Sequence, residues 1–453
     1  MTDAAVATAG EPQTAIFGQP RGVFYLAFTE AWERFSFYGM QALLVLYLVN
    51  SLLKPANAQR VVGLETLRRG LGTILGPLST QAFASEIFGL YGGLVYFTPV
   101  FGGLLGDRVL GQRRTVMLGA VLMAAGHLLM AFDAPFLMAL LLLIVGCGCL
   151  KGNISAQVGN LYEAGDARRT RAFAIFNVGI NFGGLFGPFV CGAIGEIYGW
   201  HYGFAVAGVL MLAALATYTA GLRWMPPDRR RVARAPKVAM SRHDWNVVFA
   251  LLAMLVLGVF FSIAYYQLSD SYMIWISATV DRRAFGVTVP VTWFSGLDSL
   301  FTIASTPLLI RFWQWQAARG TEPGDLTKIG LASFAVAAAH CMLAFASRGH
   351  GPVSIIWPLL FSGILGTAFV YQWPTTLALV SRAAPAQINS TMMGVSFLTL
   401  FLSYNIVGWL GGFYERMSPS QFWLMNAAIG VTGGILVFIF RRPLGRILTA
   451  PAP

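Results

Sequence analysis

The sequence predicts an all-α protein that crosses a membrane many times. Of its 453 residues, 56% are hydrophobic and only 11% are charged, whereas a soluble protein carries about a quarter charged residues. A membrane span requires about 20 mostly apolar residues, and twelve segments meet this requirement. They are residues 22–53, 84–105, 113–132, 135–162, 170–198, 202–224, 245–277, 291–315, 327–347, 353–380, 388–413 and 419–440.

The longest basic break in this pattern divides the twelve segments into two sets of six. It reads RWMPPDRRRVARAPKVAMSRHDW and lies between the sixth and seventh spans. Two six-helix bundles joined by such a loop are typical of the major facilitator fold, in which the substrate site lies near the midplane between the bundles. We therefore expect an N-terminal bundle at 1–224, a basic cytoplasmic linker at 225–244 and a C-terminal bundle at 245–453.

The positive charges indicate the orientation of the chain. With both termini in the cytoplasm, 21 of the 31 Lys and Arg residues fall in cytoplasmic segments and 8 in external ones, as the positive-inside rule requires. The net charge of +12 therefore reflects topology, and no nucleic-acid partner is expected. The polar N-terminal residues predict no signal peptide. The long segment from Leu53 to Ser85 predicts an external extension of the first helix and a loop that can hold a short interfacial helix.

Charged residues inside the first span mark a candidate site. Glu30, Glu33 and Arg34 lie in FYLAFTEAWERFSFYGM and share one helix face with Tyr38. Charges at this depth usually face a polar cavity on an ion or substrate path, and a structural ion pair between helices is the alternative. Lys151 lies deep in the fourth span, and its expected partners are Glu30 and Glu33.

Several segments resemble the signatures of the proton-dependent oligopeptide transporter (POT) family. TEAWERFSFYGM is similar to its ExxERFxxYG pattern, and LYGGLVYFTPVFGGLLGDRVLG places Tyr96 at the family's tyrosine. GCGCLKGNIS is similar to GxGxxKPN with Gly152 in place of proline, and NVGINFG carries the family's asparagine at Asn181. Interhelical hydrogen bonding is an equally good account of that asparagine.

The resemblance implies proton-coupled import of di- and tripeptides by alternating access. It implies a monomer in the cytoplasmic membrane that uses the proton gradient and no cofactor. In the family, the first-helix charges and the fourth-helix lysine serve proton coupling and bind the peptide carboxylate. The residues expected to couple protons are Glu30, Glu33, Arg34 and Lys151. Those expected to bind substrate are Arg34, Tyr38, Tyr96, Lys151, Asn181, Tyr266, Gln267, Asp298 and Ser396.

A second set of charges predicts gating. GGLLGDRVLGQRRTVMLG resembles the cytoplasmic signature of major facilitators, in which the acid and arginines form a charge relay, here through Asp107, Arg108 and Arg113. A basic topology anchor is the alternative. Asp270, near the end of the seventh span, is expected to be an external gate acid or simply a span-end residue.

The C-terminal half departs from the family pattern. Tyr266 stands where the seventh helix usually carries an acid, Ser396 replaces the tryptophan of the eleventh helix, and the tenth span has no acid. Asp298 stands where the eighth helix commonly has asparagine. We expect Asp298 to bind the substrate ammonium in place of the missing tenth-helix glutamate, and pairing with a gate residue is the alternative.

The sequence leaves one other class of transported solute open and disfavours an enzyme or a channel. The missing tenth-helix acid leaves open another anionic or zwitterionic solute, such as a modified amino acid, nitrate or a peptide-like drug. A membrane enzyme is disfavoured because the sequence has no HExxH, GxSxG or phosphate loop. Cys147 and Cys149 point in different directions on a helix, so no metal site is expected. A channel is disfavoured by the coupled charges and the two halves.

Overall fold

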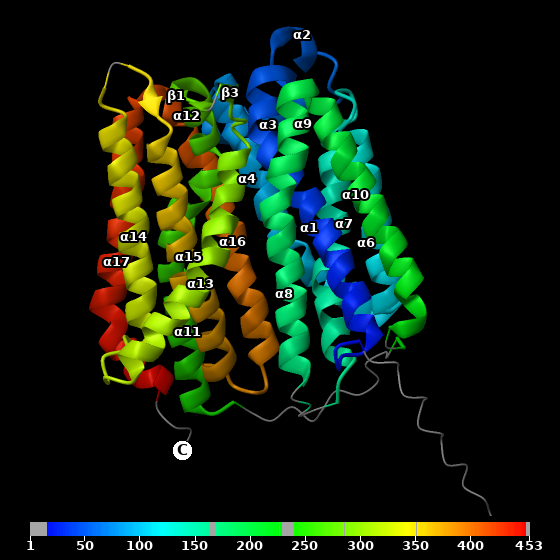
Figure 1. Cartoon of the computed structure of the whole chain (residues 1–453), viewed down its shortest axis with the longest axis vertical. Coiled ribbons are helices and arrows are strands. Elements are labelled where there is room, and N and C mark those ends of the chain that lie inside the picture. Colours follow the sequence, from blue (N-terminus) through cyan, green and yellow to red (C-terminus); the bar gives the residue numbers. More distant parts are fainter. Residues whose placement is uncertain are drawn as a thin grey trace, which may run out of the picture.

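The computed structural model is a bundle of long helices that run side by side (Figure 1). It describes residues 16–163, 166, 168–225, 227–228, 240–284, 286–349 and 351–449. Nine helical segments in this part of the chain are long and apolar enough to cross a membrane. Three further helices of 18 to 28 residues, α6, α13 and α15, lie alongside them, so the chain is an all-α polytopic membrane protein.

Short π-helical or 3-10-helical segments, labelled η, interrupt or end the helices of the first half. They are α1 (Arg21–Tyr47), η1 (Leu48–Leu52), α2 (Pro55–Ala58), α3 (Leu64–Leu75), α4 (Thr80–Phe97), α5 (Pro99–Leu105), η2 (Gly106–Leu110), α6 (Gln112–Leu129), α7 (Phe136–Asn160), α8 (Arg168–Gly187), η3 (Pro188–Gly192), α9 (Ala193–Tyr198), α10 (Trp200–Gly221) and η4 (Leu222–Trp224). Pro99 and Pro188 each stand at the first position of a new segment, where the missing N–H of proline costs least.

The second half adds two small pairs of strands to its helices. Its elements are α11 (Arg242–Tyr266), η5 (Gln267–Ser269), α12 (Ser271–Thr279), β1 (Val280–Asp281), β2 (Arg283–Ala284), β3 (Val287–Thr288), α13 (Trp293–Ala317), α14 (Asp325–Ala346), β4 (Val353–Ser354), α15 (Ile356–Ala383), α16 (Asn389–Gly411), η6 (Tyr414–Arg416) and α17 (Pro419–Thr449). Strand β1 pairs with β4 in parallel, and β2 pairs with β3 antiparallel.

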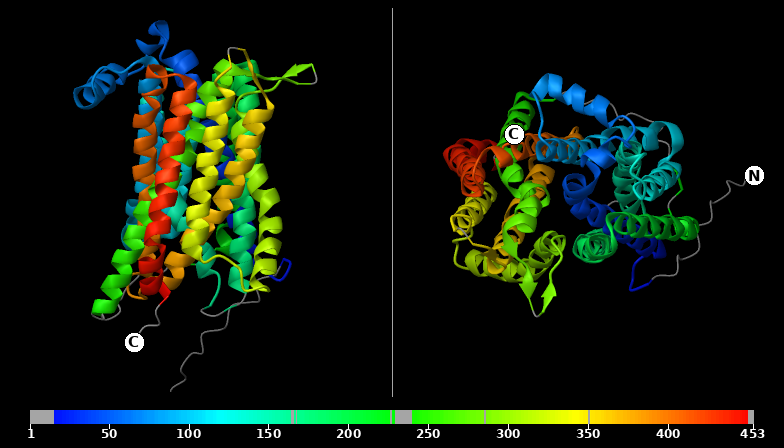
Figure 2. Two further views of the ribbon diagram at one scale, coloured as in Figure 1. Left: turned by 90° about the vertical axis from the view of Figure 1, so that its left-hand side faces the viewer. Right: turned by 90° about the horizontal axis from the view of Figure 1, so that it is seen from above.

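The helices pack as two groups. In the first, α1 packs against α8 and α10, and α6 packs against α7. In the second, α14 packs against α15 and α17, and α11 against α16 and α17. Viewed from above, the blue-to-green first group (α1 to α10) and the green-to-red second group (α11 to α17) lie on opposite sides (Figure 2). They meet through α4 with α16 and α8 with α13.

The twelve predicted spans all correspond to helices in the structure, and each begins within four residues of its predicted start. The start of α1 and the end of α17 lie at the same end of the bundle (Figure 1). We call this the termini end and the other the far end. Most of the linker predicted at 225–244 lies outside the described residues.

Helix α3 confirms the prediction of a short helix between the first two spans. It leaves the far end of the bundle sideways (Figure 2). Leu64, Leu67 and Leu71 pack against the core, whereas Ile74 on the same side is 80% exposed. An apolar stripe of this kind is typical of a helix that lies in the membrane interface, which stays a prediction.

A glycine of the second span permits a close contact between two helices of the first group. A Cβ built on Gly102 of α5 would lie 1.9 Å from the carbonyl oxygen of Gly148 in α7. The side-chain amide of Asn153 also donates to the Gly102 carbonyl at 2.9 Å. Gly102 therefore allows a close approach of α5 to α7.

We expect Gly102→Ala to destabilise the protein, because the new methyl group overlaps the backbone of α7. Overpacking of this kind costs about 1–3 kcal/mol. The matched control is Gly103→Ala on the same helix, since nothing lies within 4 Å of its built Cβ. Thermal unfolding in detergent measures both variants, and equal unfolding temperatures for the two would contradict the close contact.

Candidate functional site

The charged residues of α1 form one buried cluster. Glu30, Glu33 and Arg34 are 3%, 0% and 2% exposed. The Arg34 guanidinium donates to both carboxylate oxygens of Glu33, with Nη2 at 2.7 Å from Oε1. Its Nε also lies 3.2 Å from Oε1 of Glu30. The other oxygen of Glu30 has no hydrogen-bond partner, so Glu30 is the less engaged acid of the two.

Lys151 of α7 does not pair with these acids. In the described part of the chain it has no carboxylate within ion-pair distance, so the expected pairing with Glu30 or Glu33 is wrong for this structure. Its ammonium lies instead 3.9 Å from the centre of the Tyr96 ring. A cation over an aromatic face is stabilised by the ring quadrupole, and this contact leaves the ammonium able to accept an anionic partner.

A chain of aromatic rings links Lys151 to the second group. The ring of Tyr96 stacks on Tyr404 of α16 with centroids 5.6 Å apart, and Tyr404 lies 4.5 Å from Tyr266 of α11. Tyr266 contacts Tyr265 at 5.1 Å. The amide of Gln41 in α1 donates to the Tyr404 hydroxyl at 3.1 Å. Sequence reasoning missed Tyr404, because one tyrosine in an apolar span carries no distinguishing signal.

Asp298 contacts Tyr265, the last ring of this aromatic chain. The Tyr265 hydroxyl donates to its Oδ2 at 2.6 Å. Its Oδ1 has no hydrogen-bond partner, although the side chain is 7% exposed. A buried carboxylate with one unsatisfied oxygen is costly unless a cation or donor reaches it. The alternative prediction, pairing of Asp298 with a charged gate residue, has no ion pair to support it among the described residues.

The other predicted binding residues are less closely connected. Tyr38 lies beside the cluster, with the Arg34 guanidinium 6.0 Å from its ring centre. Asn181 and Ser396 bond to backbone carbonyls one turn earlier in their own helices, at 2.9 and 3.1 Å. Gln267 is fully buried at the break between α11 and α12, and neither atom of its amide has a partner.

The predicted relay at the termini end is not formed in this structure. Asp107 accepts a hydrogen bond from Gln112 at 3.3 Å, and Arg108 is exposed. Arg113 donates through its backbone N–H to Asp228 at 2.9 Å and through its side chain to the Met225 carbonyl. In the described residues no ion pair joins Asp107 to an arginine, so the segment after η4 takes the place expected for that acid.

Asp270 joins the two groups at the far end. It is fully buried, and its Oδ1 accepts the hydroxyl of Ser85 in α4 at 2.9 Å, while Ser271 donates to Oδ2 at 3.0 Å. Hydrogen bonds join the first group to the second through Gln41, Gln81, Ser85, Phe189 and Glu196. Direct hydrogen bonds therefore hold the two groups together at the far end.

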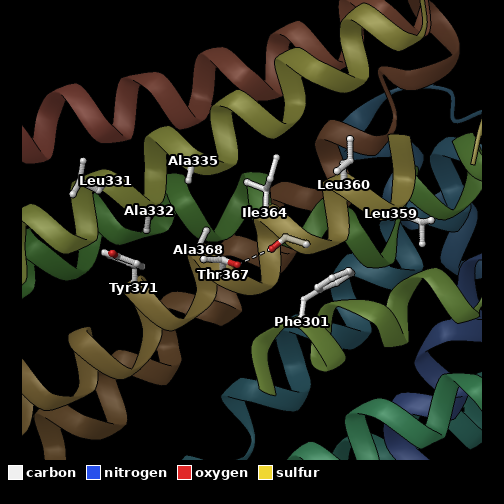
Figure 3. A pocket seen from close by; sticks show the side chains of 11 residues that line it. Phe301, Leu331, Ala332, Ala335, Leu359, Leu360, Ile364, Thr367, Ala368 and Tyr371 are labelled. Atoms are coloured by element: carbon white, nitrogen blue, oxygen red, sulfur yellow. Dashed lines mark hydrogen bonds between the residues drawn. The ribbon is translucent and has the colours of Figure 1, made fainter. Parts of the chain in front are cut away.

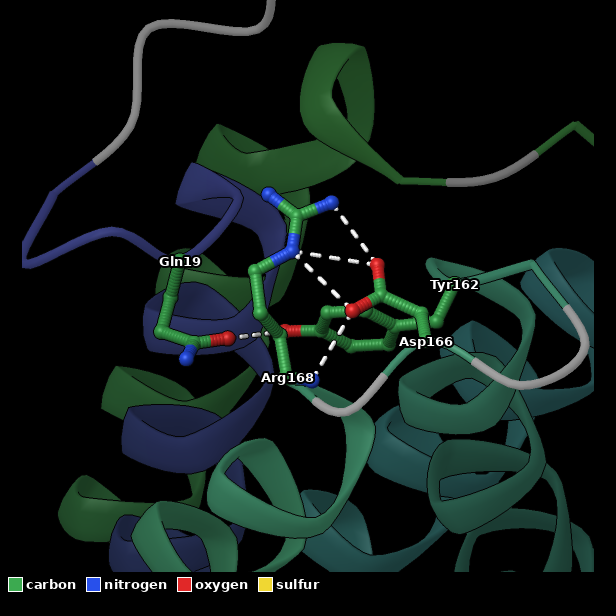
Figure 4. Close-up of polar contacts among 4 residues, drawn as sticks. All are labelled: Gln19, Tyr162, Asp166 and Arg168. Atoms are coloured by element: carbon green, nitrogen blue, oxygen red, sulfur yellow. Dashed lines mark hydrogen bonds and ion pairs between the residues drawn. The ribbon is translucent and has the colours of Figure 1, made fainter.

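A small polar cluster fastens the loop between α7 and α8 at the termini end (Figure 4). The Tyr162 hydroxyl donates to Oε1 of Gln19 at 2.6 Å, and the Arg168 guanidinium donates to Asp166 at 2.7 and 3.0 Å. These hydrogen bonds lower the pKa of the Asp166 carboxyl. The cluster holds the segment before α1 against the end of α7, away from the buried charges.

An apolar pocket of about 460 Å³ lies among α13, α14 and α15 (Figure 3). Phe301, Leu331, Ile364 and other apolar side chains line it, and the Thr367 hydroxyl is satisfied by the Gly363 carbonyl at 2.9 Å. Without a charged lining residue it does not suit a zwitterionic substrate. The buried charges between the helix groups are the better candidate site.

Two groups of membrane helices with a buried charged cluster are typical of a secondary transporter. Comparison with protein families identifies the family of this transporter. The model of the POT family matches residues 113–240 and 230–424. The chain belongs to the POT family, whose related proteins are transporters and not enzymes.

Curated relatives cover nearly the whole chain. The di-/tripeptide transporter of Lactococcus lactis subsp. cremoris is 28% identical, over 96% of this chain and 98% of the relative. The peptide transporter YePEPT of Yersinia enterocolitica is 27% identical, over 95% and 96%. An uncharacterized transporter, YclF, of Bacillus subtilis is also 28% identical, over 94% and 95%.

Solved structures agree with this assignment. A peptide transporter POT in complex with sulfate superposes with a TM-score of 0.85, at 24% identity over 97% of this chain and 98% of that one. A mutant peptide transporter POT in complex with alafosfalin has a TM-score of 0.83 at 26% identity, with the same coverage. The described fold is therefore the major facilitator fold of POT transporters.

Proposed function

We propose that this protein is a proton-coupled symporter that imports di- and tripeptides across the cytoplasmic membrane by alternating access. Membership of the POT family and the di-/tripeptide transporter of Lactococcus lactis at 28% identity support the substrate class. The observation that carries the proposal is the buried cluster of two acids and an arginine in α1, with a lysine nearby that has no carboxylate partner in the described residues. The moving parts are the bundles 1–224 and 245–453, and both termini lie in the cytoplasm.

The cluster suggests how substrate and proton are coupled. A peptide carboxylate that enters between Arg34 and Lys151 competes with Glu30 and Glu33 for the guanidinium. Arg34 offers a planar fork suited to a carboxylate, and Lys151 offers a point charge. A glutamate displaced from Arg34 is left unpaired in a low-dielectric site, which is costly, and binding a proton removes that cost. The open oxygen of Glu30 makes it the acid that is displaced more easily.

The gates complete the cycle. Asp270 holds the far end closed through Ser85, and Asp107, Arg108 and Arg113 act at the termini end. In this structure Arg113 bonds to Asp228 and Met225. We propose that Arg113 exchanges these partners for Asp107 when the termini end closes, and that Arg108 joins the same ion-pair network. The protein acts as a monomer, with the proton gradient as its driving force.

The test is uptake of labelled dialanine into proteoliposomes. An inward proton gradient should drive accumulation above the external concentration, and a protonophore should abolish it. Uptake that merely equilibrates with a gradient present would refute coupling. Absence of any dialanine uptake or binding by the intact protein would refute the peptide assignment.

A substrate carboxylate is expected to bind Arg34 and Lys151, so capping that carboxylate should weaken binding. We expect the C-terminal amide of dialanine to compete with labelled dialanine at least tenfold less well, a factor that corresponds to about 1.4 kcal/mol. The two ligands differ only at the carboxyl group, so the free dipeptide is its own control. Equal inhibition by both would remove these cations from the binding site.

A second candidate is transport of another zwitterionic or anionic solute. The observation that favours it is the lack of an acid in α15, where Ala368 and Phe369 occupy the region in which an ammonium partner is expected. Phe369 stacks on Tyr265 instead, with centroids 5.4 Å apart. A panel of modified amino acids, nitrate and peptide-like drugs in the same competition assay separates the two candidates.

A further inference from the structure

Glu196 of α9 reaches across from the first helix group to the second. Its Oε1 accepts the backbone N–H of Thr292 at 2.7 Å and the Thr292 hydroxyl at 2.8 Å. Its Oε2 accepts the backbone N–H of Val291 at 2.8 Å and lies 3.8 Å from Nη1 of Arg282. One carboxylate therefore receives three hydrogen bonds and faces one cation, all from the other group.

The residues that donate to Glu196 immediately precede α13, where a negative charge is favoured. The first N–H groups of a helix have no partner within it, and the helix dipole attracts a negative charge there. Thr292 precedes α13 and supplies no side-chain cap of its own. Glu196 binds the N–H groups of Thr292 and of Val291 before it. A side chain of the opposite group thus holds the N-terminal end of this 25-residue helix through charge-assisted hydrogen bonds.

The surrounding residues are shaped for this contact. A Cβ built on Gly192 would lie 2.2 Å from the Thr292 hydroxyl oxygen, so only glycine allows this approach. The indole N–H of Trp293 donates to the Phe189 carbonyl at 3.1 Å, and the two rings stack with centroids 5.0 Å apart. No other carboxylate in the described residues binds backbone N–H groups at the N-terminal end of a helix in the opposite group. Asp270, at the same end of the bundle, accepts hydrogen bonds from neutral groups, which include the hydroxyls of Ser85 and Ser271.

The contact of Glu196 with the second group is partly exposed to water, which allows it to break as well as form. The side chains of Glu196 and Arg282 are 14% and 22% exposed, so water is at hand to replace the lost hydrogen bonds when the groups separate. The contact is strong while closed and can be exchanged for water when open.

We propose that Glu196 is the latch of the far end: its carboxylate stabilises the closed state and must leave the start of α13 before substrate can enter. The inference rests on the alternating access of the proposed function. It adds a gating residue that the sequence motifs do not mark. Removing the carboxylate should shift the population toward the state that is open at the far end, because that state loses no such contact.

The shift can be measured with spin labels on both sides of the latch. Tyr202 at the start of α10 and Ile356 at the start of α15 are 64% and 58% exposed and belong to opposite groups. Both are changed to Cys in a Cys341→Ser background, since Cys341 is the exposed cysteine and the other three are buried. Pulsed electron paramagnetic resonance in nanodiscs then gives the distance distribution without peptide or proton gradient, so failure of the transport assignment does not affect the readout.

We expect Glu196→Ala to raise the ratio of long to short distances about tenfold, as the loss of one charge-assisted interaction implies. Glu196→Gln keeps an acceptor oxygen and should shift the ratio less. Thr292→Val removes only the hydroxyl donor and should shift it least. The control Glu65→Ala removes an exposed acid on α3 at the same end and should leave the distribution unchanged.

The order of the variants decides the outcome. Size-exclusion and thermal unfolding first establish that each variant is folded, and Thr292→Val keeps the test available if Glu196→Ala is not. A parent-like distribution in the folded Glu196 variants would overturn the proposal. So would an equal shift in Glu65→Ala, because the effect would then be unspecific.

Discussion

Glu33→Gln is expected to abolish accumulation of dialanine against its gradient while leaving counterflow exchange measurable. Both oxygens of Glu33 accept hydrogen bonds from Arg34 in a fully buried site. The amide is nearly isosteric but carries no charge and cannot exchange a proton with the pathway. Net symport needs that proton movement, whereas exchange of internal for external peptide does not.

The same measurements need a matched control. Glu65→Gln makes the same chemical change in an exposed ion pair with Arg69, and it should transport as the parent does. Uptake with and without an inward proton gradient, compared with counterflow from preloaded vesicles, separates the two activities. Full gradient-driven uptake by the folded Glu33→Gln protein would show that coupling does not pass through this acid.

The membrane helices and the charged face of α1 are the features of the structure that hydropathy and residue spacing predict. The helices at the twelve predicted spans were predictable because a membrane crossing requires about 20 apolar residues, whatever the helices contact. The shared burial of Glu30, Glu33 and Arg34 was predictable for a related reason, since their spacing alone places them on one turn of α1. These predictions depend only on a single helix and its solvent.

The contacts between helices were less predictable. The position of Lys151 in its span does not say which neighbour its side chain faces, and it lies over Tyr96 of α4 rather than against the acids of α1. In a helix that is apolar on all sides, the hydrophobic pattern does not fix the rotation about its axis. The contact of Asp298 with Tyr265 was missed for the same reason.

The charged residues of the predicted gates were also difficult to assign from the sequence. Asp107 and Arg113 have other partners in this structure, so the predicted relay between them is not visible in it. Glu196 was missed because an acid near the end of a span is ordinary. Glu196 binds the start of α13 because the fold brings α9 close to it, although the two helices are far apart in the sequence.

Asp298→Asn is expected to weaken the affinity for unmodified dipeptides at least tenfold. Oδ1 of Asp298 has no partner and Oδ2 is held by the Tyr265 hydroxyl, so the carboxylate is positioned with one oxygen available to a substrate ammonium. Breaking a buried charge pair by removing one partner costs about 3–5 kcal/mol, and about 1.4 kcal/mol already gives a tenfold change.

The ligand comparison distinguishes an ammonium anchor from a gate. N-acetylated dipeptides carry no ammonium, so Asp298→Asn should weaken their binding much less, whereas a gating defect would affect both ligands alike. Tyr265→Phe is the matched control, since it removes the hydrogen bond to Oδ2 but keeps the charge, and it should retain the preference for free amino termini. If Asp298→Asn binds both ligands as the parent does, the ammonium is bound elsewhere, and Asp270, the other buried acid of the second group, becomes the residue to change.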